Sequence, residues 1–189
     1  MEVLLKNIII AGCSRTGKTT LSEFIAKDGF IHYRMDSIKR AIFKVFCPNE
    51  STDWKDISPK IAEFLKILIK EQEENKNSNH QVYCFDTCHL YPIDIYKANI
   101  PNTIIIFLGY CNIDRLTKLK EIRMYDEKHI WTSSLTDEEI LKNIDLDIKY
   151  SMEAKRQCQE LNIPFFDTSY DYHKVLNEAY NHIKSQLNT

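Results

Sequence analysis

The sequence predicts an α/β fold with three layers, in which a five-stranded parallel sheet has helices on both faces. Five short apolar runs are spread along the chain, and continuous apolar runs of this length are typical of strands that are buried on both faces. Segments with helical periodicity separate these runs, and strands that alternate with helices form parallel sheets. The five runs cover residues 8–11, 30–33, 82–85, 103–108 and 163–166.

Two helical patterns lie between the second and third runs. In the first, Ile38, Ile42 and Val45 share one face. The second is an amphipathic helix of about four turns, because its apolar residues recur at helical spacing. Those residues are Ile57, Ile61, Phe64, Leu65 and Leu68. The pair Ser58-Pro59 predicts where this helix begins, since proline suits a first helical turn.

Two further helix signals lie in the second half of the chain, and one loose loop precedes them. Thr136 and Glu139 have the spacing of a capping box and predict the start of a helix. Helical spacing of apolar residues predicts a terminal helix that contains Val175, Ala179, Ile183 and Leu187. Residues 75–80 predict a loop, and no internal repeat is visible in the chain.

Length and composition predict a single domain that spans residues 1–189. The apolar share is 43%, the charged share is 28%, and no apolar run approaches the roughly 20 residues that a membrane span needs. No export signal is visible, so we expect a soluble, cytoplasmic protein whose six scattered cysteines are reduced thiols. The net charge of −2 argues against a nucleic-acid-binding surface and leaves the oligomeric state open.

The stretch that follows the first run has the pattern GxxxxGK[ST] and predicts a phosphate-binding loop. A strand precedes it and a helix follows it, which is the context that the motif requires. Backbone N–H groups and the helix N-terminus bind phosphate oxygens, Lys18 reaches the β and γ phosphates, and Thr19 offers its hydroxyl to Mg²⁺. The ligand is therefore a nucleoside triphosphate. The predicted nucleotide-binding residues are Gly12, Cys13, Ser14, Arg15, Thr16, Gly17, Lys18, Thr19 and Thr20.

Asp36 follows the second run, where a helix begins, and it has two possible roles. In a parallel sheet, ligands bind at the carboxyl ends of the strands, so Asp36 is placed to accept the proton of an acceptor hydroxyl. Arg40, one turn later, is placed to bind an anionic part of that acceptor. The alternative is that Asp36 caps the helix and that Arg40 is a surface residue.

Asp86 ends the third run and is predicted to order the waters of a Mg²⁺ ion beside Thr19. The alternative is an aspartate that starts a turn. A magnesium ion bound to ATP is thus the cofactor set that the sequence predicts.

With these features the chain resembles the P-loop small-molecule kinases of the adenylate-kinase-like group, which includes nucleoside monophosphate, shikimate and gluconate kinases. The resemblance implies a P-loop NTPase fold with a helical lid over ATP, here at about residues 112–135, and an adenine-binding loop at residues 167–171. Many members carry GxxGxGK, whereas Arg15 replaces the middle glycine in this chain. Neither the acceptor signature of adenylate kinases nor the glycine-rich acceptor loop of shikimate kinases is present, so the acceptor is not predicted.

Two arginines support the prediction of a lid. Leu116, Leu119 and Arg123 lie on one helical stripe, so Arg123 occupies a position where an apolar residue would be expected. A triphosphate under the lid would provide an anion for Arg123, and Arg115 could bind the same triphosphate. The alternative is a local pair between Arg123 and Asp126 or Glu127.

Three function classes follow from these features. The favoured one is a kinase that transfers the γ-phosphoryl group of ATP to a small acceptor, through a hydroxyl, with Lys18, Asp36 and Arg123 as catalytic residues. The second is a nucleoside monophosphate kinase, in which Arg40 binds the acceptor phosphate. The third is a nucleotide-binding regulatory ATPase. A GTPase switch would carry an NKxD motif, and the chain has none.

Overall fold

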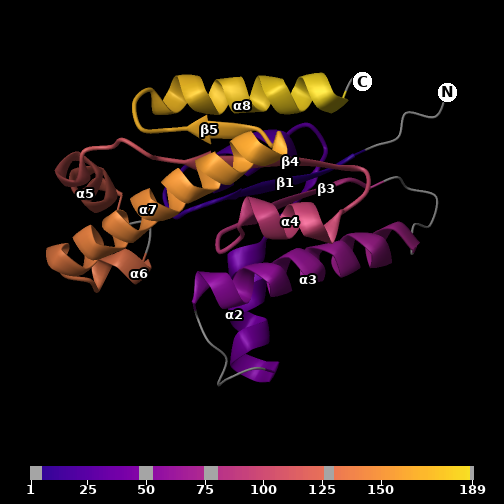
Figure 1. Ribbon diagram of the computed structural model, residues 1–189, viewed down its shortest axis with the longest axis horizontal. Coiled ribbons are helices and arrows are strands. Elements are labelled where there is room, and N and C mark those ends of the chain that lie inside the picture. Colours follow the sequence, from indigo (N-terminus) through magenta and orange to yellow (C-terminus); the bar gives the residue numbers. More distant parts are fainter. Residues whose placement is uncertain (1–5, 47–52, 75–80, 126–129, 188–189) are drawn as a thin grey trace.

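The computed structural model describes residues 6–46, 53–74, 81–125 and 130–187. Its centre is a sheet of five parallel strands in the order β2-β3-β1-β4-β5 (Figure 1). The strands are β1 (Asn7–Gly12), β2 (Ile31–Arg34), β3 (Tyr83–Thr87), β4 (Thr103–Gly109) and β5 (Phe165–Asp167). All five predicted strands are confirmed, and no boundary moves by more than two residues. The expectation of burial on both faces is met by β1, β3 and most of β4, but it was wrong for the edge strands β2 and β5, which are only partly buried because each has a single neighbouring strand.

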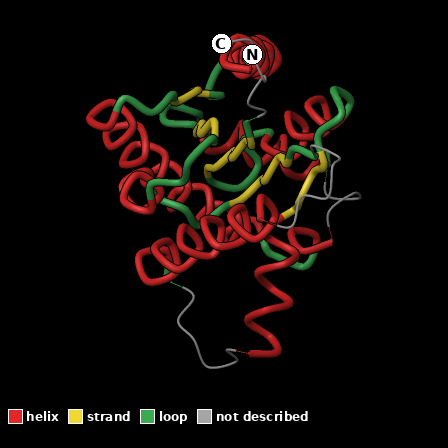
Figure 2. The backbone as a smooth tube through the Cα atoms, turned by 90° about the vertical axis from the view of Figure 1, so that its right-hand side faces the viewer, coloured by secondary structure: helices red, strands yellow, loops and turns green. Residues whose placement is uncertain are grey.

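Helices cover both faces of the sheet, as predicted (Figure 2). Side chains alternate across a strand, so Ile8 and Ile10 of β1 pack on α1 (Lys18–Ala26) and α8 (Tyr172–Leu187). Ile9 and Ala11 face the opposite side, whose core includes residues of α3 (Trp54–Glu74), α4 (Pro92–Ala98) and α7 (Asp137–Leu161). Burial on both faces explains why β1 is apolar from Ile8 to Ala11.

The prediction for the start of α3 was wrong by four residues. The helix begins at Trp54, so Pro59 lies inside it rather than in its first turn. The cost is one helical hydrogen bond, because proline has no N–H to donate to residue 55. Packing compensates for this loss, since the ring of Trp54 lies 4.4 Å from the rings of both His89 and Tyr150. Contacts between distant segments of this kind leave no local signal in the sequence.

The helix signals in the second half are confirmed. Thr136 caps α7, with the Thr136 side chain accepting from the backbone of Glu139 and the Glu139 side chain accepting from the backbone of Thr136. In α8, Ala179 and Ile183 are buried as their spacing predicts. The predicted loop at residues 75–80 lies outside the described residues.

Two short helices, α5 (Arg115–Met124) and α6 (Ile130–Ser133), lie between β4 and α7, in the segment predicted as a lid. They project beyond the end of the sheet at which β1 leads into the phosphate loop (Figure 1). On the opposite side of that loop, α2 (Met35–Phe46) follows β2 directly. Within the described ranges, no helix is long and apolar enough to cross a membrane.

Candidate active site

The phosphate loop connects β1 to α1 in a conformation that its sequence explains only in part. Gly12 has a φ of +143°, and a Cβ on it would lie 1.9 Å from the carbonyl oxygen of Leu108, so only glycine fits there. Arg15 has a φ of +59°, in the left-handed region that is uncommon for residues with a side chain. This is the position at which the resembled kinases often carry glycine, and the backbone keeps a conformation that suits glycine.

The loop and the start of α1 have features that suit an anion. Lys18 is only 7% exposed, and its ammonium group donates a hydrogen bond to the carbonyl oxygen of Cys13, across the loop. Thr16 is fully buried and donates to the same carbonyl at 3.1 Å. The first turn of α1 contains no acidic residue and its N-cap, Gly17, has no side chain. No acidic side chain of the first turn of α1 therefore neutralises the positive end of this helix.

A second lysine reaches the loop from the lid segment. Lys118 of α5 is 5% exposed and donates a hydrogen bond of 3.1 Å to the carbonyl oxygen of Arg15. Its ammonium group lies 4.8 Å from the centre of the Tyr110 ring. Arg15 in turn donates a hydrogen bond of 2.7 Å to Thr132 of α6. Both helices of the predicted lid segment thus contact the phosphate loop, and Lys118, which the sequence did not single out, binds the loop backbone.

The two arginines that the sequence predicted over the triphosphate bind α7 in this structure. Arg115 forms an ion pair of 3.1 Å with Asp145. Arg123 donates to Asp137 at 2.7 Å and to the carbonyl oxygen of Leu135 at 2.7 Å. Arg123 therefore satisfies its charge at the start of α7, which is a partner that neither sequence interpretation considered.

The proposed local partners of Arg123, Asp126 and Glu127, lie outside the described residues. Whether Arg115 or Arg123 binds nucleotide stays a prediction, and each would first have to exchange its carboxylate partner for a phosphate.

Asp36 lies in the first turn of α2, one residue inside the helix rather than at its cap. Its Oδ1 accepts from the backbone N–H of Cys88 at 3.2 Å and from the Cys88 thiol at 2.8 Å, and Lys39 lies 3.3 Å away. Burial on its own would raise the pKa of Asp36, but Lys39, Lys18 and the Cys88 hydrogen bonds together lower this pKa to about 2. The carboxylate is thus held ionised, and it connects α2 to the end of β3.

Lys39 and His89 complete a polar cluster around Asp36. The ammonium group of Lys39 lies 2.7 Å from Nδ1 of His89, and the Cys88 thiol lies 2.7 Å from the same nitrogen. Burial, followed by the positive charge of Lys39, lowers the pKa of His89 to about 4, so its ring is neutral at pH 7. Asp36, Cys88 and His89 are close enough to share a metal ion, but the Lys39 ammonium already provides the positive charge there.

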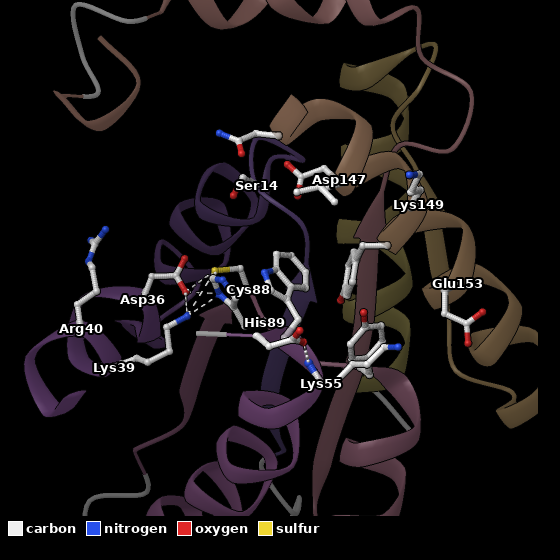
Figure 3. A pocket seen from close by; sticks show the side chains of 16 residues that line it. Ser14, Asp36, Lys39, Arg40, Lys55, Cys88, His89, Asp147, Lys149 and Glu153 are labelled. Atoms are coloured by element: carbon white, nitrogen blue, oxygen red, sulfur yellow. Dashed lines mark hydrogen bonds and ion pairs between the residues drawn. The ribbon is translucent and has the colours of Figure 1, made fainter. Parts of the chain in front are cut away.

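A cavity of about 740 Å³ opens beside the phosphate loop (Figure 3). One wall carries Asp36, Lys39 and Arg40 from α2, and the opposite wall carries residues of α7, while Ser14 of the phosphate loop lies between them. Lys39 extends toward Asp36, whereas Arg40 extends away from it (Figure 3). Three aromatic side chains add an apolar part to the lining: Trp54, Tyr91 and Tyr150. The mixture of charged and aromatic groups is typical of a small-molecule site.

Asp147, on the α7 wall, is the second carboxylate near the loop. It accepts a hydrogen bond of 2.9 Å from the hydroxyl of Tyr110, and the backbone N–H of Ser14 also contacts it. Burial raises the pKa of Asp147 to about 6, although the Tyr110 hydrogen bond and the charges of Lys18 and Lys118 act in the opposite direction. No motif in the sequence points to Asp147, because it lies far along the chain from the phosphate loop and from the strand ends that lead into Asp36 and Asp86.

Asp86 is 3% exposed at the end of β3 and shares the α1 side of the sheet with Cys84. Its Oδ2 lies 3.1 Å from Nε2 of His32, but the two atoms are not oriented for a hydrogen bond. Within the described part of the chain, this buried oxygen has no hydrogen-bond partner. An oxygen of this kind suits a water of a hydrated Mg²⁺ ion, with Thr19 at the start of α1 on the same side of the sheet.

The magnesium role of Asp86 predicts a measurable change. Asp86→Asn should raise the Mg²⁺ concentration needed for half-maximal activity by roughly ten- to a hundredfold, the usual effect of losing a group that orients metal ligands. The melting temperature should change little, since asparagine has nearly the same shape. Asp56→Asn, at an exposed position of α3, is the control. An unchanged Mg²⁺ requirement in Asp86→Asn would leave Asp86 with a structural role only.

The loop predicted to hold adenine is tied to the end of β4. Thr168 donates its backbone N–H and its hydroxyl to the carbonyl oxygen of Gly109, at 2.7 and 3.0 Å. Asp167 accepts from the backbone N–H of Cys111 and forms an ion pair of 3.2 Å with Lys155. These bonds fix the loop, and adenine binding by residues 167–171 stays a prediction.

Comparison with solved structures identifies the fold. Shikimate kinase from Bacteroides thetaiotaomicron is 14% identical, with 98% of this chain and 99% of that chain covered and a TM-score of 0.53. A gluconokinase from Sinorhizobium meliloti 1021 is 13% identical, with 98% and 95% covered and a TM-score of 0.54. Shikimate kinase from Acinetobacter baumannii, solved in complex with shikimate, is 14% identical, with 96% and 94% covered and a TM-score of 0.57.

No protein-family model matches the chain, and no curated protein matches it. The structural likeness nevertheless extends over nearly the whole chain, so the protein has the fold of the P-loop small-molecule kinases, as the sequence predicted.

Proposed function

We propose that this protein is an ATP-dependent kinase that transfers the γ-phosphoryl group of MgATP to a hydroxyl of a small molecule bound in the cavity. The observation that supports this most strongly is the position of Ser14, which belongs to the phosphate loop and also lines the cavity of about 740 Å³. A phosphate bound to the loop would thus border a space that is large enough for a small acceptor.

The nucleotide side of the reaction is assigned to the loop and its neighbours. Backbone N–H groups of residues 12–20 bind the phosphates, and Lys18 neutralises charge between the β and γ phosphates. Thr19 and Asp86 hold the Mg²⁺ ion, which neutralises phosphate charge when it is bound. Arg115 and Arg123 are the lid cations in the prediction from the sequence, and Lys118 is closer to the loop in the structure.

The acceptor side of the reaction is assigned to the α2 wall. Asp36 accepts a hydrogen bond from an acceptor hydroxyl, and Arg40 binds an anionic group of the acceptor. In the transfer, the acceptor oxygen forms a bond to the γ phosphorus while the bond from that phosphorus to the β–γ bridging oxygen breaks. ADP leaves, and the hydroxyl proton passes to a carboxylate.

A nucleoside monophosphate kinase is the second candidate, and the exposed guanidinium group of Arg40 in the cavity favours it. Basic and acidic side chains both line the cavity, and among the basic ones Arg40 is exposed and forms no ion pair among the described residues. A phosphate on the acceptor would use this charge, and Asp36 would then accept no proton.

An acceptor screen separates these candidates. The protein is incubated with MgATP and with separate pools of polyols, hydroxy acids, nucleosides and nucleoside monophosphates, and the products are identified by mass. A phosphate ester of a hydroxyl is the expected result, whereas conversion of a monophosphate to a diphosphate would support the second candidate. ATP binding with no transfer to any pool would contradict both and support a regulatory ATPase.

A further inference from the structure

Two carboxylates face the place where the phosphate loop meets the cavity. Asp36 approaches from α2 and Asp147 approaches from α7, and both lie within the electrostatic influence of Lys18. Figure 3 shows Asp147 beside Ser14, with Asp36 on the other side of Ser14. Because Lys18 is the group expected to reach the γ phosphate, a hydroxyl that attacks this phosphate would pass between the two carboxylates.

The contacts of Asp36 make it a poor proton acceptor. Its Oδ1 already receives two hydrogen bonds from Cys88 and faces Lys39 at 3.3 Å. These partners stabilise the ionised form and lower the pKa of Asp36 to about 2. A general base works best when its pKa lies near the working pH. Asp36 is therefore better suited to hold an acceptor hydroxyl than to take its proton.

Asp147 has the environment that a general base needs. Within the described residues it is the carboxylate that both lines the cavity and contacts the backbone of the phosphate loop, at Ser14. The groups that face it come from four elements: Lys18 of α1, Lys118 of α5, Tyr110 after β4, and Cys13 of the loop. Burial outweighs both lysines and raises the pKa of Asp147 to about 6.

We propose that Asp147, and not Asp36, is the general base that takes the proton of the acceptor hydroxyl; this rests on the proposed kinase function. As the acceptor oxygen bonds to the γ phosphorus and the bond to ADP breaks, the hydroxyl proton moves to the carboxylate of Asp147. The proton then leaves Asp147 for water, which restores the carboxylate for the next cycle. Asp36 is a positioning residue that orients the acceptor.

The pH dependence of transfer tests this assignment. The assay uses full-length protein, ATP labelled at the γ phosphate and a protein-free extract of cell metabolites at a fixed, low concentration as the acceptor mixture. Transfer by the unmodified protein should fall as the pH drops through about 6, because protonated Asp147 cannot accept a proton. His89 titrates near pH 4 in the same cavity, so its effect is separable.

Three variants complete the test. Asp147→Asn should lower transfer by about 10²- to 10⁴-fold and abolish the decline near pH 6, while MgATP affinity and melting temperature stay close to those of the unmodified protein. Asp36→Asn should keep the decline near pH 6. Once the labelled product has identified the acceptor, kinetics with the pure acceptor should show that this variant mainly raises the acceptor KM. Glu138→Gln, on the exposed side of α7, is the matched control and should behave like the unmodified protein.

The outcomes distinguish the base assignment from the kinase function. Normal transfer in the unmodified protein together with an unaltered rate in Asp147→Asn would overturn the role of Asp147 and leave the kinase function intact. If Asp36→Asn, and not Asp147→Asn, abolished the decline near pH 6, Asp36 would be the general base. If Asp147→Asn fails to fold, Asp147→Glu replaces it, and a decline that keeps its original midpoint would contradict the proposal. Absence of labelled product from the unmodified protein would overturn both.

Discussion

Lys18→Ala is expected to weaken MgATP binding by roughly ten- to a hundredfold. The reason is that Lys18 provides a charged hydrogen-bond donor to the phosphates, and such a bond contributes about 1.5–3 kcal/mol. Turnover should fall further, since charge builds up on the transferring group in the transition state. Isothermal titration with MgATP measures the first effect, and the acceptor assay measures the second.

Lys27→Ala is the matched control, because Lys27 ends the same helix and lies over the Phe24 ring, away from the loop. The control should bind MgATP with unchanged affinity. If Lys18→Ala also bound MgATP and turned it over normally, the phosphate loop would not be the nucleotide site, and the kinase function would lose its basis.

Gly12→Ala is expected to destabilise the protein by about 3 kcal/mol or more. The new Cβ would lie 1.9 Å from the Leu108 carbonyl oxygen, on the backbone of β4, which cannot move without disturbing the central pair of strands. Overpacking of this kind costs about 1–3 kcal/mol, and the left-handed backbone adds to it. Urea denaturation of the variant and the unmodified protein gives the difference in free energy of unfolding.

Gly29→Ala separates the clash from the backbone strain. Gly29 also has a positive φ, +95°, but a Cβ there would meet no atom within 4 Å. The free energy of unfolding of Gly29→Ala should therefore fall only by the backbone strain, about 1–2 kcal/mol. Equal losses in the two variants would show that the close approach of β1 to Leu108 contributes nothing to the requirement for glycine.

The sheet was predictable because its signal is local. The central strands β1, β3 and β4 contain continuous apolar runs, and the helical periodicity of α3 and α8 can be read over ten or more residues. The capping box of Thr136 and Glu139 is equally local, so it predicted the start of α7 correctly. The start of α3 was not predictable in this way, since it depends on the packing of Trp54 against His89 and Tyr150.

The site was predictable where a motif fixes it and not where the tertiary fold assembles it. The phosphate loop lies where its motif placed it, whereas Lys118 and Asp147 approach it from helices far along the chain. Arg123 illustrates the same limit. Its position on an apolar stripe correctly suggested that it needs an anion, but Asp137 of the next helix provides one in this structure.

Arg15 links the stability of the phosphate loop to the arrangement of the lid. Its backbone adopts a left-handed conformation that glycine would adopt without strain, while its side chain binds Thr132 and its carbonyl binds Lys118. One residue thus connects the loop to both lid helices, at an expense of about 1–2 kcal/mol in backbone strain. A glycine at this position would relax the loop but uncouple it from α6. In this chain the conformation of the loop and the positions of α5 and α6 are therefore joined through Arg15.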